Sequence, residues 1–291
     1  MRKPTGYNSN ADLLEGDKAY IQRARIALPI LVRQAKALKP IFYSDLAEEM
    51  GMLNPRNLNY VLGAIGNALT SLAERLKIPN IPLINCLVIN KANHLPGEGI
   101  SWFIDKKNFT KLTKSQKRET INRYLDEIYI YPDWDMILNE LGLESVKTEY
   151  VKKIKPLISK SNSGWGGGES QSHIDFKNFL AKHPELFELS PEFNVKIEYE
   201  LPSADKIDVV FKNKGEIIGI EAKSIISDTG DILRGLFQCV KYKALLEAEQ
   251  IVNDLIPDCH VYLALEGSFP EQHIGIRNQL GIQVIDNIKS T

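Results

Sequence analysis

The chain has 291 residues, of which 43% are hydrophobic and 25% charged, and its formal net charge is −1. This length and apolar content suit two folded domains, whereas no run approaches the 18 apolar residues that a membrane span needs. The start, Met1-Arg2-Lys3-Pro4, lacks the apolar core of a signal peptide, and three scattered cysteines argue against a disulfide framework, so we expect a cytoplasmic protein.

The first part of the chain predicts helices. Apolar residues at helical spacing predict a helix over residues 21–37. Ser44 can cap a short helix over residues 45–50. Asn54 as N-cap and Pro55 at the first helical position begin a long helix. The core face of that helix consists of Leu58, Val61, Leu62, Ile65, Leu69, Leu72 and Leu76.

The opposite face of the long helix has side chains that can bond phosphates and base edges. They are Arg56, Asn57, Asn59 and Tyr60. Strand patterns follow over residues 81–89 and 99–103. A helix, a turn, a helix and then a hairpin predict a winged helix-turn-helix, and hence an α+β domain that binds duplex DNA. Winged helices also serve as dimerisation surfaces, and this alternative stays open.

Residues 40–103 are similar to the DNA-binding domain of the alkylguanine-DNA alkyltransferases. The matching stretches are Tyr43-Ser44-Asp45-Leu46-Ala47, Gly63-Ala64-Ile65-Gly66-Asn67-Ala68-Leu69, Ile81-Pro82 and Leu87-Val88-Ile89. That family's acceptor motif is Pro-Cys-His-Arg, but this chain has Pro82-Leu83-Ile84-Asn85, and Cys86 is out of place. The resemblance therefore implies a DNA-binding shape without alkyl transfer.

The two halves of the chain carry opposite charge. Residues 1–160 contain 24 Lys and Arg against 17 Asp and Glu, a net +7, whereas residues 161–291 contain 12 against 20, a net −8. A basic half suits a polyanion, although solvated surface charge is the alternative. The Ser- and Gly-rich residues 159–168 form a linker. We therefore expect a DNA-binding domain over residues 1–158 and a second domain over residues 169–291.

Two apolar runs in the second half are joined by Asn213-Lys214-Gly215, which predicts a β-hairpin. A two-residue turn at Lys214 and Gly215 places Asp208 across from Glu221, and Lys223 on the same face as Glu221. Two carboxylates roughly 5 Å apart repel by about 3 kcal/mol at an effective dielectric near 20. A divalent cation would compensate this repulsion, so the pattern predicts a metal site. A turn of another length would shift the register and leave ordinary surface charges.

An acid on one strand followed by acid-any-Lys on the next resembles the PD-(D/E)XK, or restriction-endonuclease-like, nucleases. Here the motif is Asp208 and then Glu221-Ala222-Lys223, with Ile207 where the family often has proline. The resemblance covers residues 165–291. It implies an α/β domain with a mixed central sheet, and one or two Mg²⁺ ions, which Mn²⁺ can replace. In that family the ligands are the two acids and the carbonyl of Ala222, and Lys223 orients water or stabilises the transition state.

The flanking helices extend this resemblance. Many members have a metal-site acid on the first helix of the domain, and Glu169 is the candidate here, although it can equally be a capping charge. His173, four residues later, is a candidate phosphate contact or a partner of the metal ligands. Gln238 and Tyr242, also four apart, match a Gln-x-x-x-Tyr pair that lies beside the active site in several branches. The order of a helix, three strands, a helix, a strand, a helix and a strand matches the family core.

Together these patterns predict a Mg²⁺-dependent endonuclease that binds and cuts double-stranded DNA. Restriction or phage defence is the expected setting. Cutting both strands needs two active sites, which favours a homodimer, and no phosphate-binding loop predicts a nucleotide cofactor. A non-catalytic DNA-binding or scaffold protein with a degenerate nuclease fold is one alternative. An RNA-directed nuclease is the other.

Overall fold

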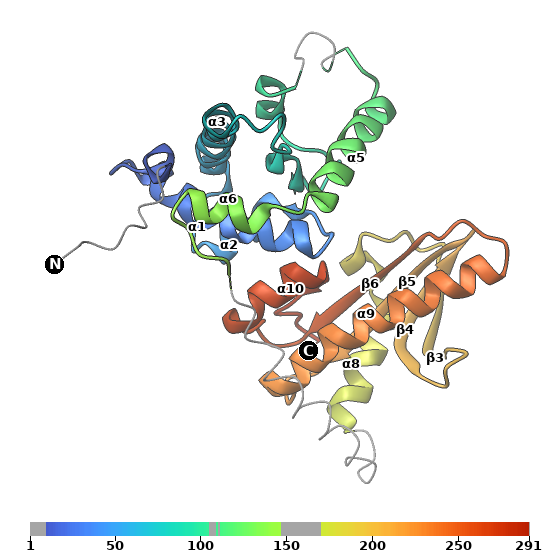
Figure 1. Cartoon of the computed structure of the whole chain (residues 1–291). Coiled ribbons are helices and arrows are strands. Elements are labelled where there is room, and N and C mark those ends of the chain that lie inside the picture. Colours follow the sequence, from blue (N-terminus) through green and yellow to red (C-terminus); the bar gives the residue numbers. More distant parts are fainter. Residues whose placement is uncertain (1–9, 105–108, 110, 147–169, 291) are drawn as a thin grey trace. The chain divides into compact units, whose positions relative to one another are not determined.

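The computed structural model describes residues 10–104, 109, 111–146 and 170–290 of the chain. These residues form two compact units, which divide at residues 148 and 149 (Figure 1). The first is mainly helical, and the second is built on a five-stranded mixed sheet, so the chain belongs to the α+β class. No helix in the described part has both the length and the apolar character to cross a membrane. The expected linker, residues 159–168, lies outside the described residues.

Five helices make up most of the described part of the first unit. They are α1 (Ala19–Lys36), α2 (Tyr43–Glu49), α3 (Leu58–Leu76), α5 (Lys114–Ile130) and α6 (Trp134–Glu140). Two short strands, β1 (Ile41–Phe42) and β2 (Val88–Ile89), pair in parallel. Short 3₁₀ helices, η1 (Ala11–Leu14), η2 (Pro55–Asn57), η3 (Ile84–Leu87) and η4 (Glu98–Trp102), connect these elements.

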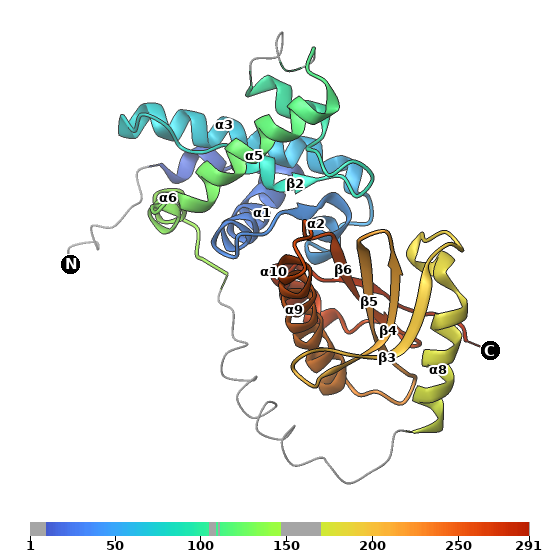
Figure 2. The ribbon, with the colours of Figure 1, turned by 90° about the vertical axis from the view of Figure 1, so that its right-hand side faces the viewer.

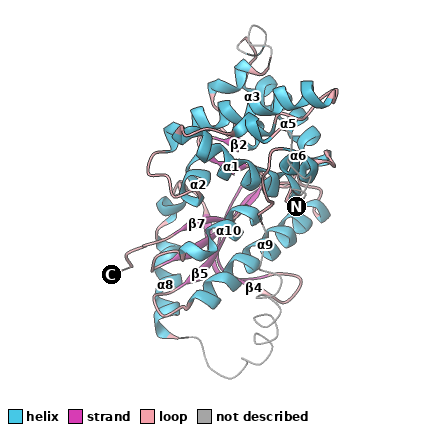
Figure 3. Cartoon of the chain, turned by 60° about the vertical axis from the view of Figure 1, so that its left-hand side comes forward, coloured by secondary structure: helices cyan, strands magenta, loops and turns pink. Residues whose placement is uncertain are grey.

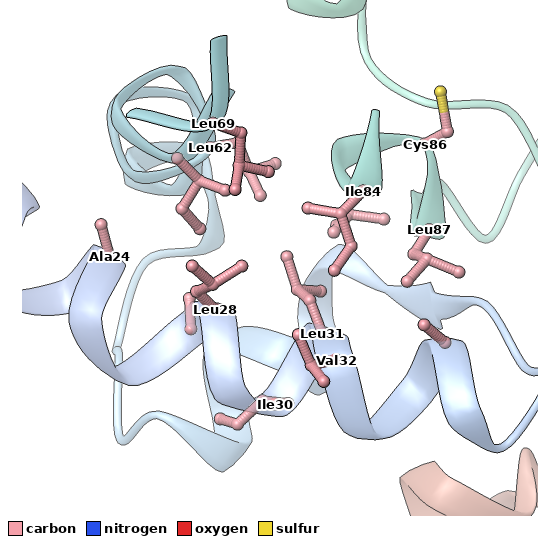
Figure 4. Packing of buried hydrophobic residues seen from close by; sticks show 14 of the residues in the cluster. Ala24, Leu28, Ile30, Leu31, Val32, Leu62, Leu69, Ile84, Cys86 and Leu87 are labelled. Atoms are coloured by element: carbon pink, nitrogen blue, oxygen red, sulfur yellow. The ribbon is translucent and has the colours of Figure 1, made fainter. Parts of the chain in front are cut away.

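The core of the first unit forms around α1. Leu28 and Leu31 are fully buried and point from α1 toward Leu62 on α3 and Ile84 on η3 (Figure 4). The apolar residues of α3 recur at helical spacing, so one continuous stripe of that helix packs on α1. Burying each such side chain contributes about 1.5–3 kcal/mol, which makes this contact a main source of the unit's stability.

Several local predictions for the first unit were wrong. Residues 99–103 lie largely in the 3₁₀ helix η4, and only Val88 and Ile89 of residues 81–89 form a strand. The described residues of this unit therefore contain no antiparallel hairpin. Ser44 lies inside α2 and does not cap it. The predicted cap at Asn54 is confirmed, because its side chain accepts the N–H of Arg56 and Pro55 follows at the first helical position. The first turn is the 3₁₀ helix η2, and α3 follows it directly.

The second unit contains a sheet of strand order β3-β4-β5-β6-β7. Its strands are β3 (Asn194–Glu200), β4 (Lys206–Asn213), β5 (Glu216–Lys223), β6 (Cys259–Leu265) and β7 (Gln283–Ile285). Strands β3, β4 and β5 are antiparallel neighbours, whereas β5, β6 and β7 run parallel. The helices are α8 (Gln171–Lys182), α9 (Thr229–Val252) and α10 (Ile274–Leu280), with η5 (Pro184–Phe187) and η6 (Glu271–His273). This order confirms the predicted sequence of elements.

Helices α8 and α9 cover opposite faces of this sheet (Figure 2). Phe176 and Leu180 of α8 pack with Val209, Phe211 and other residues of one face. Leu236, Leu246 and their neighbours on α9 pack against the other face. Strands and helices therefore form three layers, and Figure 3 shows the strands between the helices. A sheet buried on both faces explains why β5 is apolar along most of its length.

The turn between β4 and β5 fixes the register of the hairpin. Lys214 and Gly215 both have positive φ, 43° and 100°, as a two-residue turn with the twist of a hairpin requires. The observed pairs have the register of a two-residue turn, because Asn213 pairs with Glu216 and Val209 with Ile220. The predicted turn length and register are confirmed.

Candidate functional site

The backbone pairing of β4 is interrupted at Asp208. Strand β3 pairs with Ile207 and Val209, the residues on either side of Asp208, but not with Asp208 itself. Strand β5, on the other edge of β4, pairs with β4 only as far as Val209. The side chain of Asp208 bridges the gap, since its Oδ2 accepts the backbone N–H of Ala222 at 2.8 Å. The carboxylate is thereby held between the two strands, opposite Glu221 in the register.

Glu221 and Lys223 form a buried ion pair beside Asp208. Lys223 Nζ lies 2.6 Å from Glu221 Oε1, and the two side chains are 12% and 4% exposed. A strand alternates its side chains, so both residues project to the same face of β5, toward α9. The predicted proximity of Glu221 and Lys223 is observed.

Burial and neighbouring charges shift the pKa values of both Glu221 and Lys223. Burial raises the pKa of Glu221 to about 7, the Lys223 ammonium opposes this rise, and the negative charge of Asp208 adds to it. Burial acts to lower the pKa of Lys223, but the Glu221 carboxylate, together with Asp208 and Asp231, more than offsets it, so that pKa lies above its ordinary value. The charge of Asp208 therefore acts on the buried pair of Glu221 and Lys223, and the net negative charge of the three groups favours a further cation.

Helix α9 supplies a polar row next to this pair. Lys223 Nζ donates to Gln238 Oε1 at 3.3 Å, and Gln238 Nε2 donates to the Tyr242 hydroxyl, also at 3.3 Å. Burial raises the pKa of Tyr242, so its hydroxyl stays protonated at neutral pH. The structure thus brings Gln238 and Tyr242 to the site, as the sequence predicted.

Helix α8 reaches the site from the opposite side of the sheet. Ser170 caps its start by accepting the N–H of His173. His173 Nε2 lies 3.4 Å from Asp208 Oδ1, and both side chains are largely buried. His173 therefore contacts a candidate metal ligand and is not an isolated surface histidine. Glu169, the other candidate on this helix, lies outside the described residues.

The donor set fits a hard divalent cation. Asp208 and Glu221 supply carboxylate oxygens, which Mg²⁺ prefers, and Lys223 neutralises only one of the two charges. These two residues, with the backbone of Ala222 beside them, could hold the ion. Among the described residues, no group of three or more His, Cys, Asp or Glu side chains is arranged to hold a metal.

Gly235 was not predicted from the sequence, yet it lets α9 approach the site. A Cβ at this position would lie 2.7 Å from Leu263 Cδ1 and 3.0 Å from Lys223 Cε. Leu263 is fully buried and cannot move aside freely. The signal in the sequence is a glycine in the interior of a helix, where it costs about 1 kcal/mol relative to alanine.

We expect Gly235→Ala to lower the rate of the site's reaction about 100-fold, because a misplacement near 1 Å has that effect. The gain in helix propensity offsets part of the steric cost, so the melting temperature changes little. Gly219→Ala is the matched control, since its Cβ would have its nearest contacts at 3.4–3.5 Å. Equal rates for the two variants would show that α9 does not constrain Lys223.

A second group that the sequence did not reveal joins α8 to the edge strand β3. Lys177 Nζ lies 2.9 Å from Glu198 Oε1, and Lys206 Nζ lies 3.1 Å from Glu198 Oε2. The Lys177 side chain is only 4% exposed. Glu198 has φ of +50°, a left-handed conformation that costs a residue with a side chain about 1 kcal/mol or more. The ion pairs compensate for this strain.

Hydrogen bonds from Lys177 and Lys206 lower the pKa of Glu198 to about 2. A carboxyl with a lowered pKa stabilises the fold fully above its ordinary pKa of 4.5, and this contribution is lost as the pH falls toward 2. We therefore expect wild type to exceed Glu198→Gln in free energy of unfolding at pH 6, and by a smaller margin at pH 3. Urea denaturation measures both. Glu200→Gln, on the same strand, is the control, and a margin independent of pH would contradict the expectation.

The first unit contains a separate cavity of about 630 Å³. Its lining includes Tyr43, Tyr60, Trp102, Phe103, Asn67 and Asn85. Asn85 is 4% exposed; its Nδ2 donates to the carbonyl of Leu62, while its Oδ1 has no hydrogen-bond partner among the described residues. The aromatic walls of this cavity suit a planar ring.

The predicted nucleic-acid contacts lie at or near this cavity. Arg56, Asn57, Asn59 and Tyr60 are all exposed. Asn59 and Tyr60 line the cavity, Arg56 and Asn59 line the neighbouring hollow, and Asn57 lines neither. Cys86 is fully buried, and burial raises the pKa of its thiol, so it is not a reactive thiolate.

Comparison with known proteins adds no assignment: no protein-family model matches the chain, and no curated protein matches it significantly.

Proposed function

We propose that the second unit is a Mg²⁺-dependent nuclease that hydrolyses phosphodiester bonds in DNA. The observation that carries the proposal is the position of Asp208, Glu221 and Lys223. Asp208 spans the gap where β4 and β5 separate, and its charge acts on the buried ion pair of Glu221 and Lys223. The resemblance to the PD-(D/E)XK nucleases supports the same activity, and the order of strands and helices is compatible with it.

Each residue has a role that follows from its chemistry. Asp208 and Glu221, with the carbonyl of Ala222, would hold Mg²⁺, which when bound supplies a Lewis acid for the phosphoryl group. Lys223 remains charged and donates to the oxygens on which negative charge develops. Gln238 holds the Lys223 ammonium in place, and Tyr242 holds Gln238. His173 braces Asp208 from the other face of the sheet.

The first unit is proposed to bind the duplex. The described residues have no wing, so this proposal depends on the exposed start of α3 and the cavity beside it. Stacking on Tyr60 or Trp102, which line the cavity, would hold an unstacked base. A DNA-binding unit joined to a nuclease suits restriction or phage defence, a step that depends on analogy alone.

The test of the nuclease is direct. Purified full-length protein is incubated with supercoiled plasmid, linear duplex and structured RNA, each with Mg²⁺, Mn²⁺ or EDTA. We expect both DNAs to be cut with either metal and neither to be cut in EDTA. Cutting in EDTA would refute metal dependence, and degradation of RNA alone would favour the RNA-directed alternative. If the protein neither binds metal nor cleaves any of these substrates, the result would favour the non-catalytic DNA-binding or scaffold protein.

The DNA-binding proposal has its own test. We expect Tyr60→Ala to weaken binding of duplex DNA about 10-fold, because loss of one base–aromatic stack costs about 1–3 kcal/mol. Fluorescence anisotropy in EDTA measures binding without cleavage. Ile130→Ala is the control, since Ile130 is an exposed apolar residue of α5 that does not line the cavity. Unchanged affinity of the Tyr60 variant would exclude the cavity as a DNA contact.

A further inference from the structure

Lys177 and His173 lie on the same face of α8. They are four residues apart, about one helical turn, so their side chains project together toward the sheet. His173 contacts Asp208 on β4, and Lys177 contacts Glu198 on β3. One helix face is therefore attached to two adjacent strands through two ionisable pairs.

The two strand residues in these pairs are also neighbours. Ile197 pairs with Val209 and Tyr199 with Ile207, so the register places Glu198 opposite Asp208. Neither Glu198 nor Asp208 belongs to a backbone pair between β3 and β4. Glu198 has left-handed backbone geometry at this point, and Asp208 directs its carboxylate to the N–H of Ala222. The interruption in β3 and the interruption in β4 thus occur side by side.

Stability alone does not favour a lysine at position 177. Phe176 and Leu180 of the same helix are fully buried and supply apolar contact with the sheet. A methionine would fill a similar volume without the cost of removing an ammonium from water. The lysine adds a directed link from α8 to Glu198, and that link lies one helical turn from the contact between His173 and Asp208.

We propose that Lys177 is a positioning residue of the nuclease site: its ion pair with Glu198 fixes α8 against the edge of the sheet, so that His173 holds Asp208 in its metal-binding orientation. This inference rests on the proposed function. Lys177 acts through Glu198 and His173 and does not itself touch the substrate. Partners that orient metal ligands in this way commonly change metal affinity 10–100-fold when they are replaced.

The experiment compares Lys177→Met with Lys206→Met in the full-length protein. Lys206 binds the same Glu198 carboxylate, but its side chain is 57% exposed and comes from β4, so its loss leaves α8 attached. We expect Lys177→Met to raise the dissociation constant for Mn²⁺, measured by electron paramagnetic resonance, about 10-fold. The Mg²⁺ concentration for half-maximal cleavage should rise equally, with Lys206→Met within 2-fold of wild type. Lys177→Arg should recover part of the affinity.

The outcomes separate this inference from the proposed function. Wild type that neither binds Mn²⁺ nor cleaves would refute the nuclease proposal. If wild type binds Mn²⁺ and cleaves DNA, and the folded Lys177→Met variant has the same metal affinity, the positioning role alone would be overturned. If Lys177→Met does not fold, Glu198→Gln replaces it, because that side chain is 43% exposed and keeps its length. Wild-type metal affinity in that variant would likewise overturn the inference.

Discussion

Replacing Lys223 with methionine should lower the rate of DNA cleavage about 1000-fold, because the loss of one donor to a developing oxyanion costs 10²–10³. The Lys223 ammonium is the one cation within hydrogen-bonding distance of Glu221 in the described part of the chain. Methionine keeps most of the side-chain volume beside Gly235, so the packing of α9 is retained. Single-turnover cleavage at saturating Mg²⁺ measures the chemical step and separates it from metal binding.

The fold should survive this substitution for a specific reason. Removing a partner from a buried ion pair usually leaves a costly charge. Here the pKa of Glu221 is already raised to about 7, and it rises further without the ammonium, so the carboxyl takes up a proton. Lys241→Met is the control, since Lys241 is an exposed lysine of α9 paired with Asp205. Equal cleavage by wild type and Lys223→Met would exclude Lys223 from the chemistry.

The hairpin could be predicted from the sequence because its determinants are local. Lys214 and Gly215 accept positive φ, and their turn sets every pair up to Val209 with Ile220. Once that register is set, Asp208 and Glu221 must be neighbours. The interruption of pairing at Asp208 was not predicted, since it depends on the contact of a side chain with the Ala222 N–H across the strands.

The hairpin predicted for the first unit was wrong because the determinants of that region are not local. The apolar character of residues 81–89 favoured a strand, but Pro82 cannot donate to a ladder, and Ile84–Leu87 form a 3₁₀ turn packed on α1. After Gly97, whose N–H donates to the Tyr43 hydroxyl, the chain enters η4. Tertiary contacts determine the backbone conformation of both segments, and the local sequence pattern does not reveal these contacts.

The same distinction applies to the site. Helical spacing alone predicted that Gln238 and Tyr242 project together, and the resemblance to the PD-(D/E)XK nucleases predicted that this pair lies beside the site. Lys177 and Glu198 could not be predicted, because their contact depends on how α8 crosses the edge strand and on one residue with positive φ. A buried lysine and an exposed-strand glutamate look like ordinary surface charges in the sequence.

Asp208→Asn should weaken Mn²⁺ binding by at least about 100-fold, since even partners that only orient a ligand account for up to that factor. Asparagine keeps an oxygen that can accept the Ala222 N–H at the position of Asp208 Oδ2, so the link between the strands survives. The substitution removes a negative charge that now acts on Glu221, so the metal-free protein should not lose stability. Cleavage should fall below detection at Mg²⁺ concentrations that saturate wild type.

Calorimetric titration with Mn²⁺ and thermal unfolding in EDTA measure the two effects on one sample. Asp205→Asn is the matched control, because Asp205 is an acid of the turn before β4 and pairs with Lys241. Mn²⁺ affinity equal to that of wild type in Asp208→Asn would show that this carboxylate does not hold the ion. A large fall in melting temperature would instead assign Asp208 a structural role, that of replacing the missing backbone pair between β4 and β5.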